Sequence, residues 1–170
     1  MDLKQHIRHV PDFPKQGILF YDITTLLRDP AGFKMTVDML ATPYEDQGIE
    51  AVVGIESRGF ILGAAVAERI GAGFVPIRKP GKLPAKALKE TYDLEYGQDA
   101  IEIHEDAIQQ GQRVLIVDDV LATGGTASAA AQLVKKLGGD LHGLAFLIEL
   151  LFLNGKSRLP GEKIFSVLQY

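Results

Sequence analysis

The chain of 170 residues contains no cysteine and no tryptophan. Without cysteine it can form neither a disulfide nor a thiolate metal site. Long apolar runs are missing too. The longest, near residues 145–153, is interrupted by Glu149 and falls short of the ~20 residues that a membrane-spanning helix needs. The opening residues, MDLKQH, lack the apolar core of a secretory signal. We therefore expect a cytoplasmic protein with no membrane partner.

Positive charge is also scarce, with 18 lysines and arginines against 22 acidic residues and a formal net charge of −4. A nucleic-acid-binding protein usually carries a basic face that neutralises phosphates, so this balance argues against a nucleic-acid partner. The four histidines show no spacing typical of a metal site. The composition, 46% hydrophobic and 24% charged, is typical of a globular protein, and no linker divides the chain. We expect a single domain over residues 1–170.

Short β-type runs alternate with helical patterns, which is typical of an α/β fold with a parallel sheet. The expected strands are 51–55, 74–77, 113–117, 141–148 and 164–168, and the expected helices are 33–40, 60–70 and 127–137. Pro76 indicates that the second of these strands has an end or an unpaired position. The opening of the chain, through Pro14, predicts a short helix followed by a turn.

A polar excursion from this core covers residues 79–104, where prolines, glycines and charges are dense. Within it, residues 91–94 and 100–103 are expected to pair as a small hairpin. A polar segment of this length on a compact α/β core predicts a lid or a binding loop.

The segment with the clearest chemistry begins with the apolar run 114–117, which is typical of a strand buried on both faces. Asp118 and Asp119 follow it, and a loop then opens the next helix; its residues are Ala122, Thr123, Gly124, Gly125 and Thr126. Backbone N–H groups, hydroxyls and the positive end of a helix dipole suit a phosphate. The two carboxylates suit the vicinal hydroxyls of a ribose, or water on a divalent metal. Together these groups indicate a sugar phosphate.

A tight turn with an Asp or Thr helix cap is the alternative for this segment. Such a turn needs neither adjacent aspartates nor threonines on both sides of two glycines. A Walker loop is excluded because no lysine follows the glycines, and the dinucleotide-binding pattern G-x-G-x-x-G is absent.

Residues 114–127, VLIVDDVLATGGTA, resemble the phosphoribosyl-pyrophosphate motif of the type I phosphoribosyltransferases. Further segments resemble the adenine-specific branch of that family, and the likeness covers essentially the whole chain. These segments are PDFP at 11–14 with GILFYDI at 17–23, ESRGF at 56–60, RKPGKLP at 78–84, LEYG at 94–97 and FSVLQY at 165–170. The resemblance implies a single-domain parallel-sheet fold with flanking helices. It also implies a small hood built from both termini, and a mobile catalytic loop at about 82–96.

The resemblance implies that Asp118 and Asp119 hold the ribose hydroxyls and that residues 122–126 hold the 5′-phosphate. It assigns the pyrophosphate group to Glu56, Ser57, Arg58, Arg78, Lys79 and Lys82. A hydrolase nucleophile elbow at Ser57 is excluded, since Ile55 stands where G-x-S-x-G requires its first glycine. The family commonly has a cis peptide here, between Glu56 and Ser57. Some of the basic residues are expected to reach the neighbouring subunit's site, which implies a homodimer. On its own, such a basic cluster is more often a solvated face.

The same resemblance places the base on the ring of Phe20, with the backbone of Leu19 and Tyr21 reading its edge and Leu150 closing the other side. Tyr21 stands where most relatives have a basic residue. Purine chemistry needs a proton balance, and Glu95 is the expected general acid or base. It lies beside Tyr96 on the loop, where Glu90 and Asp93 are the other candidates. Mg²⁺ is expected to bind with the donor rather than directly to the protein.

The implied reaction joins adenine to phosphoribosyl pyrophosphate, giving AMP and pyrophosphate. Another base, such as hypoxanthine, guanine, xanthine or orotate, is one alternative. A regulator that binds the donor without turning it over is the other. Such regulators usually carry an added nucleic-acid-binding surface, and this chain shows no spare domain for one.

Overall fold

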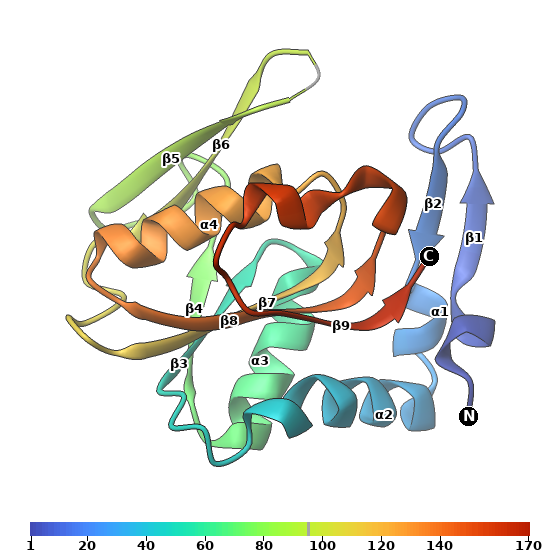
Figure 1. The fold of residues 1–170 in the computed structure, drawn as a ribbon, viewed down its shortest axis with the longest axis horizontal. Helices are drawn as coiled ribbons and strands as arrows, with labels where there is room; N and C mark the ends of the chain where they lie inside the picture. Colours follow the sequence, from blue (N-terminus) through green and yellow to red (C-terminus); the bar gives the residue numbers. More distant parts are fainter. Residues whose placement is uncertain (95) are drawn as a thin grey trace.

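The computed structural model describes residues 1–94 and 96–170, and its centre is a five-stranded parallel sheet with strand order β4-β3-β7-β8-β9 (Figure 1). The strands are β1 Arg8–Pro11, β2 Leu19–Asp22, β3 Ala51–Ile55, β4 Gly73–Ile77, β5 Ala87–Asp93, β6 Gln98–His104, β7 Arg113–Leu121, β8 Asp140–Glu149 and β9 Ile164–Gln169. The α-helices are α1 Thr24–Leu27, α2 Pro30–Ala41, α3 Arg58–Ile70 and α4 Gly125–Lys136. Single 3₁₀ turns cover Leu3–His6 (η1), Thr42–Tyr44 (η2), Leu151–Leu153 (η3) and Gly155–Arg158 (η4). The predicted α/β fold is confirmed.

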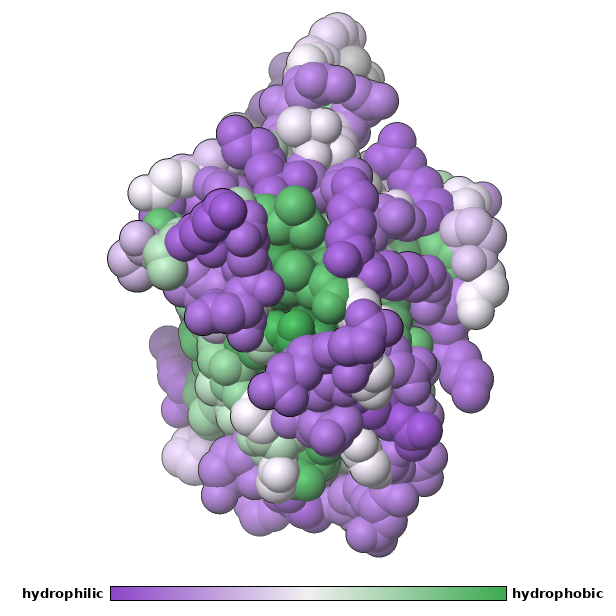
Figure 2. Space-filling view, turned by 90° about the vertical axis from the view of Figure 1, so that its left-hand side faces the viewer, coloured by the Kyte–Doolittle hydropathy of each residue, from purple (hydrophilic) through white to green (hydrophobic). Residues whose placement is uncertain are grey.

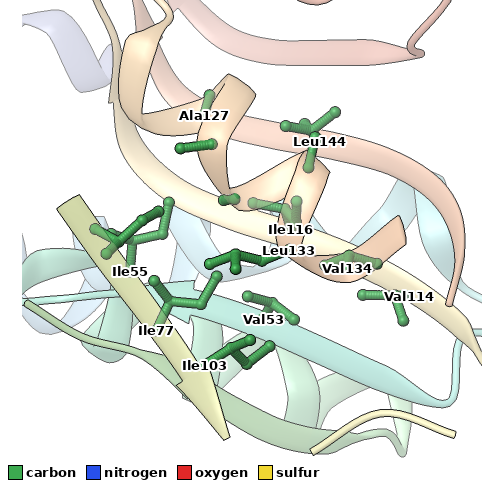
Figure 3. Close-up of a cluster of buried hydrophobic side chains, with 14 of the residues drawn as sticks. Val53, Ile55, Ile77, Ile103, Val114, Ile116, Ala127, Leu133, Val134 and Leu144 are labelled. Atoms are coloured by element: carbon green, nitrogen blue, oxygen red, sulfur yellow. The ribbon is translucent and has the colours of Figure 1, made fainter. Parts of the chain in front are cut away.

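Two apolar layers enclose the sheet. Central strands β3 and β7 are buried on both faces, as expected for a parallel sheet. Alternate residues of each strand therefore pack into opposite apolar layers. Val53 and Ile116 face α4, where Leu133 and Val134 close the layer shown in Figure 3. Helices α2 and α3 cover the other face. Strand β4 lies at the sheet edge, so Pro76 costs no central ladder bond, as its sequence position predicted.

The predicted hairpin is present but longer than expected, because β5 and β6 pair from Ala87↔His104 to Asp93↔Gln98. Ile101 and Ile103 of β6 are fully buried, so this hairpin belongs to the core on the α4 side. Strand β5 covers Ala87–Asp93, within the segment 82–96 predicted as a mobile catalytic loop, and the mobility of that segment stays a prediction. Polar residues of β5 face solvent and hide the period-two pattern.

The chain opening differs from its prediction. The short helix exists as η1, but an antiparallel hairpin of β1 and β2 replaces the simple turn. The C-terminal Tyr170 packs on it, with its ring 4.3 Å from that of Tyr21 and 5.7 Å from that of His9. This long-range contact builds the expected hood from both termini (Figure 1).

Within the described part of the chain, no helix has the length and apolarity to cross a membrane.

Candidate active site

The aspartate pair lies inside β7, which continues to Leu121 rather than ending at Val117 as the sequence suggested. Pairing with β8 runs on through Asp118↔Phe146 to Leu121↔Glu149, and this ladder carries the polar residues to the carboxyl edge of the sheet. Ligands of open α/β sheets bind at that edge. Both carboxylates thus lie on a strand, which positions side chains more precisely than a loop does.

The two carboxylates have different electrostatic surroundings. Asp119 is buried and forms an ion pair with the guanidinium of Arg58 at the start of α3. Its backbone N–H donates to Asp118 Oδ1 at 2.9 Å. Burial, and then the negative charge of Asp119, raise the pKa of Asp118 well above its usual range. Asp119 is therefore ion-paired with Arg58, whereas the ionised form of Asp118 is unfavourable.

Glycine is required beside this pair. A Cβ at Gly59 would lie 2.7 Å from Asp118 Oδ1, so the first turn of α3 approaches β7 only because residue 59 has no side chain. This close approach brings Arg58 against Asp119. The arrangement joins the end of β3 to the end of β7.

The loop of residues 122–126, called the phosphate loop below, encloses a small hollow of about 90 Å³. The residues around it are Asp118, Val120, Leu121, Ala122, Thr123, Gly124, Thr126 and Ala127. Helix α4 starts from Gly124 in a left-handed conformation, φ 89°, so no capping side chain covers its first N–H groups. Free N–H groups at the positive end of a helix bind anions. The size and polarity of the hollow fit a phosphate group.

Replacing Gly124 with alanine is expected to disable this loop. The new Cβ would meet Gly155 O at 2.4 Å and would have to adopt φ 89°. Strain and clash together should lower the free energy of unfolding by about 2–4 kcal/mol. Gly111→Ala is the matched control, since Gly111 has φ 77° with nothing within 4 Å. It should lose only about 1 kcal/mol. Equal losses in denaturant melts of the two variants would contradict the packing described here.

The side chains of Arg78 and Lys82 and the backbone of Lys79 lie around a carboxylate of their own chain. Glu56 accepts from the backbone N–H of Lys79 at 2.6 Å, pairs with Lys82 at 2.5 Å and lies 3.5 Å from Arg78 Nε. Burial would raise the pKa of Glu56, but Lys82 and the other cationic neighbours outweigh it and hold that pKa below its usual range. Glu56 therefore organises the cations. The expected cis peptide between Glu56 and Ser57 is confirmed.

Lys79 is turned differently from its neighbours. Its Nζ pairs with Asp99 of β6 and lies 3.4 Å from the hydroxyl of Tyr92 on β5. The sequence analysis missed both partners, because Asp99 is one of many charged residues in the excursion and no local spacing distinguishes it. This contact ties the β5–β6 hairpin to the end of β4.

Phe20, the predicted base platform, lies close to Arg58, the ion-pair partner of Asp119. Phe20 is half-buried, its ring makes an edge contact with Phe13 at 5.1 Å, and the Arg58 guanidinium lies 5.6 Å from the ring centre. Leu19 is exposed, whereas Tyr21 turns toward Tyr170. Arg58 thus connects the proposed base platform to the carboxylate of Asp119. Phe13 is a further residue that the sequence analysis did not single out.

The structure does not test the roles predicted for Leu150, Tyr96 and Glu95. Leu150 is buried, and its N–H donates to Leu121 O at 3.0 Å, at the end of β7 just before the phosphate loop; its base contact stays a prediction. Tyr96 is 82% exposed at the hairpin tip. Glu95, the expected general acid or base, lies outside the described residues.

Comparison with known proteins adds independent evidence. Residues 22–169 match the model of the phosphoribosyl transferase domain family. An adenine phosphoribosyltransferase of Solibacter usitatus is 62% identical over 99% of this chain and 98% of its own length. The crystal structure of that enzyme from Thermoanaerobacter pseudethanolicus has a TM-score of 0.96, with 51% identity over 99% of this chain and 98% of its own. One from Saccharomyces cerevisiae, complexed with an imino-altritol bisphosphate and adenine, has a TM-score of 0.92 with 44% identity, covering 98% of this chain and 96% of its own.

The sheet, the aspartate pair and the phosphate loop define the class as a phosphoribosyltransferase of type I fold. Identity at this level along the full chain refines the assignment. The chain belongs to the adenine phosphoribosyltransferase family.

Proposed function

We propose that this chain transfers ribose 5-phosphate from phosphoribosyl pyrophosphate to adenine, releasing AMP and pyrophosphate. The observation that carries the proposal is the aspartate pair of β7 beside the 90 Å³ hollow of the phosphate loop. Hydroxyl acceptors next to a phosphate cradle suit one sugar phosphate. The full-length match to adenine phosphoribosyltransferases supports adenine as the acceptor base.

The phosphate loop holds the 5′-phosphate through the first N–H groups of α4 and the hydroxyls of Thr123 and Thr126. Asp118 and Asp119 accept hydrogen bonds from the ribose hydroxyls. Positive charge develops on the ribose ring as the anomeric bond breaks, and the same carboxylates stabilise it.

The leaving pyrophosphate lies against the basic cluster of Arg78, Lys79 and Lys82, with the N–H groups of the Glu56–Ser57 turn. Arg78 supports this role. Its Nε is buried and has no hydrogen-bond partner among the described residues, with Glu56 at 3.5 Å as the nearest carboxylate. The Arg78 side chain as a whole is 36% exposed, so a bound polyanion would have access to it. Lys79 and Lys82 would exchange their present carboxylate partners for phosphate oxygens.

Mg²⁺ enters with the donor in this proposal. Within residues 1–94 and 96–170, no group of three or more acidic or histidine side chains is arranged to hold a metal ion. Mg²⁺ usually binds through one or two carboxylates, water and substrate phosphates, and here the phosphates of the donor would supply its main ligands. When bound, the ion neutralises charge on the leaving pyrophosphate.

A homodimer is the proposed assembly. Figure 2 shows an apolar area framed by polar residues on one face of the molecule, and such areas are typical of protein interfaces. The basic cluster now faces carboxylates of its own chain, so its reach into a partner's site stays a prediction. The cytoplasmic location stays a prediction as well.

A base panel tests the proposed specificity. We expect ultraviolet absorbance changes when donor and Mg²⁺ are mixed with adenine, and rates at least ~10²-fold lower with hypoxanthine or guanine. A site that reads a hydrogen-bonding edge through backbone groups rejects bases whose donors and acceptors are reversed. Comparable efficiency with a 6-oxopurine would overturn the base assignment, and turnover of none would favour a binding regulator.

A further inference from the structure

One buried carboxylate has no part in the proposed reaction. The buried polar and charged residues of the described chain are Thr36, Asp119 and Glu149. Thr36 donates to its own helix backbone, and Asp119 pairs with Arg58. Glu149, only 4% exposed at the end of β8, is the remaining member. A buried charge is costly unless it is paired, so its partners matter.

The Oε2 atom of Glu149 joins two segments that follow it. Ser166 Oγ donates to it at 2.8 Å and Gln169 Nε2 at 3.4 Å, both from β9. Lys156 Nζ lies 3.3 Å away, on η4. One oxygen therefore holds η4 against the last strand of the sheet.

The segment held by Lys156 forms the back of the phosphate loop. A Cβ at Gly155 would meet Ala122 O at 2.5 Å, and one at Gly124 would meet Gly155 O at 2.4 Å. Backbone packs directly on backbone here, without an intervening side chain. Any displacement of Gly155 therefore moves the phosphate loop or opens a gap behind it.

We infer that Glu149 is a positioning residue for the 5′-phosphate. Through Lys156 it fixes Gly155 against Ala122 and Gly124, and so keeps the first N–H groups of α4 aimed at the hollow. This role rests on the proposed function, which places the 5′-phosphate in that loop. Ser166 and Gln169 hold the carboxylate itself in place.

The test measures binding of ribose 5-phosphate and of magnesium pyrophosphate by calorimetry. Glu149→Gln keeps the shape and the Ser166 hydrogen bond but removes the ion pair, and Lys156→Met removes it from the other end. Each should weaken ribose 5-phosphate roughly fivefold and leave pyrophosphate unchanged. The double variant should lose no more than either single one, because both remove the same interaction.

Glu162→Gln is the matched control. Glu162 pairs with Lys135, and the side-chain exposures of 11% and 47% resemble the 5% and 47% of Glu149 and Lys156. Its ribose 5-phosphate affinity should stay unchanged. Additive losses, an equal loss in the control, or an affinity within twofold of wild type in Glu149→Gln would overturn the positioning role alone. Failure of the wild-type chain to bind ribose 5-phosphate would instead overturn the proposed function.

Discussion

Asp118→Asn is expected to raise the melting temperature of the ligand-free protein while reducing turnover by about 10²- to 10³-fold. The pKa of Asp118 is raised by burial and by the charge of Asp119, above its value in the unfolded chain. The stabilising contribution of the protonated form is therefore complete below the unfolded pKa and lost as pH rises through the folded one. At neutral pH, where Asp118 of the unfolded chain is ionised, the raised pKa of the folded chain lowers stability, and asparagine removes that cost. A gain of about 1 kcal/mol would appear as ~2–4 °C in Tm.

Asp119→Asn is the matched comparison, one residue along the same strand. It too should lose activity, but its Tm should fall, because Arg58 loses its ion-pair partner. The Tm advantage of Asp118→Asn over wild type should shrink as pH falls toward the ordinary aspartate value of 3.8. Scanning calorimetry at several pH values measures both effects. Melting temperatures that fall equally in the two variants would contradict the separate electrostatic roles.

Glu95→Gln is expected to slow single-turnover chemistry by about 10²- to 10⁴-fold, with donor affinity retained. The residue belongs to the LEYG tetrapeptide that resembles the family's catalytic loop, and a carboxyl group balances the purine proton as the new bond forms. Rapid-quench measurement separates this step from product release. Donor affinity is followed by calorimetry on the same variant.

The structure changes the choice of control for Glu95. Glu90 is paired with Lys136 of α4 at 2.5 Å, so Glu90→Gln would loosen the hairpin itself. Asp93 is the better control, since it lies two residues from Glu95. Among the described residues, its carboxylate accepts only from Gln98 Nε2, at 3.0 Å. Asp93→Asn should keep near-normal chemistry. If Asp93→Asn and Glu95→Gln slowed the step alike, the acid would be a different residue.

The local sequence pattern was enough to predict strands and helices whose burial shows in consecutive residues. Buried strands such as 51–55 were recognised because both their faces are apolar, and α3 because its apolar residues recur at helical spacing. The end of β7 was placed too early, at Val117, because two aspartates in succession are typical of a loop. In the folded chain Arg58 offsets the charge of Asp119, and β8 continues the backbone pairing.

Features that depend on distant residues could not be predicted in this way. The β1–β2 hairpin packs against Tyr170 at the opposite end of the chain. Two further contacts are long-range: the ion pair between Lys79 and Asp99, and the packing of Gly155 against the phosphate loop. For the site, the motif predicted which residue types gather. It did not predict that Glu56 would organise the cations, because that follows from three-dimensional packing.

Phosphorus NMR of the purified chain with phosphoribosyl pyrophosphate, adenine and Mg²⁺ tests the central claim most directly. The account predicts that the donor signals are replaced by those of AMP and pyrophosphate in equal amounts, with no conversion when adenine is left out. Donor that stays intact, or that yields ribose 5-phosphate and pyrophosphate without AMP, would contradict it.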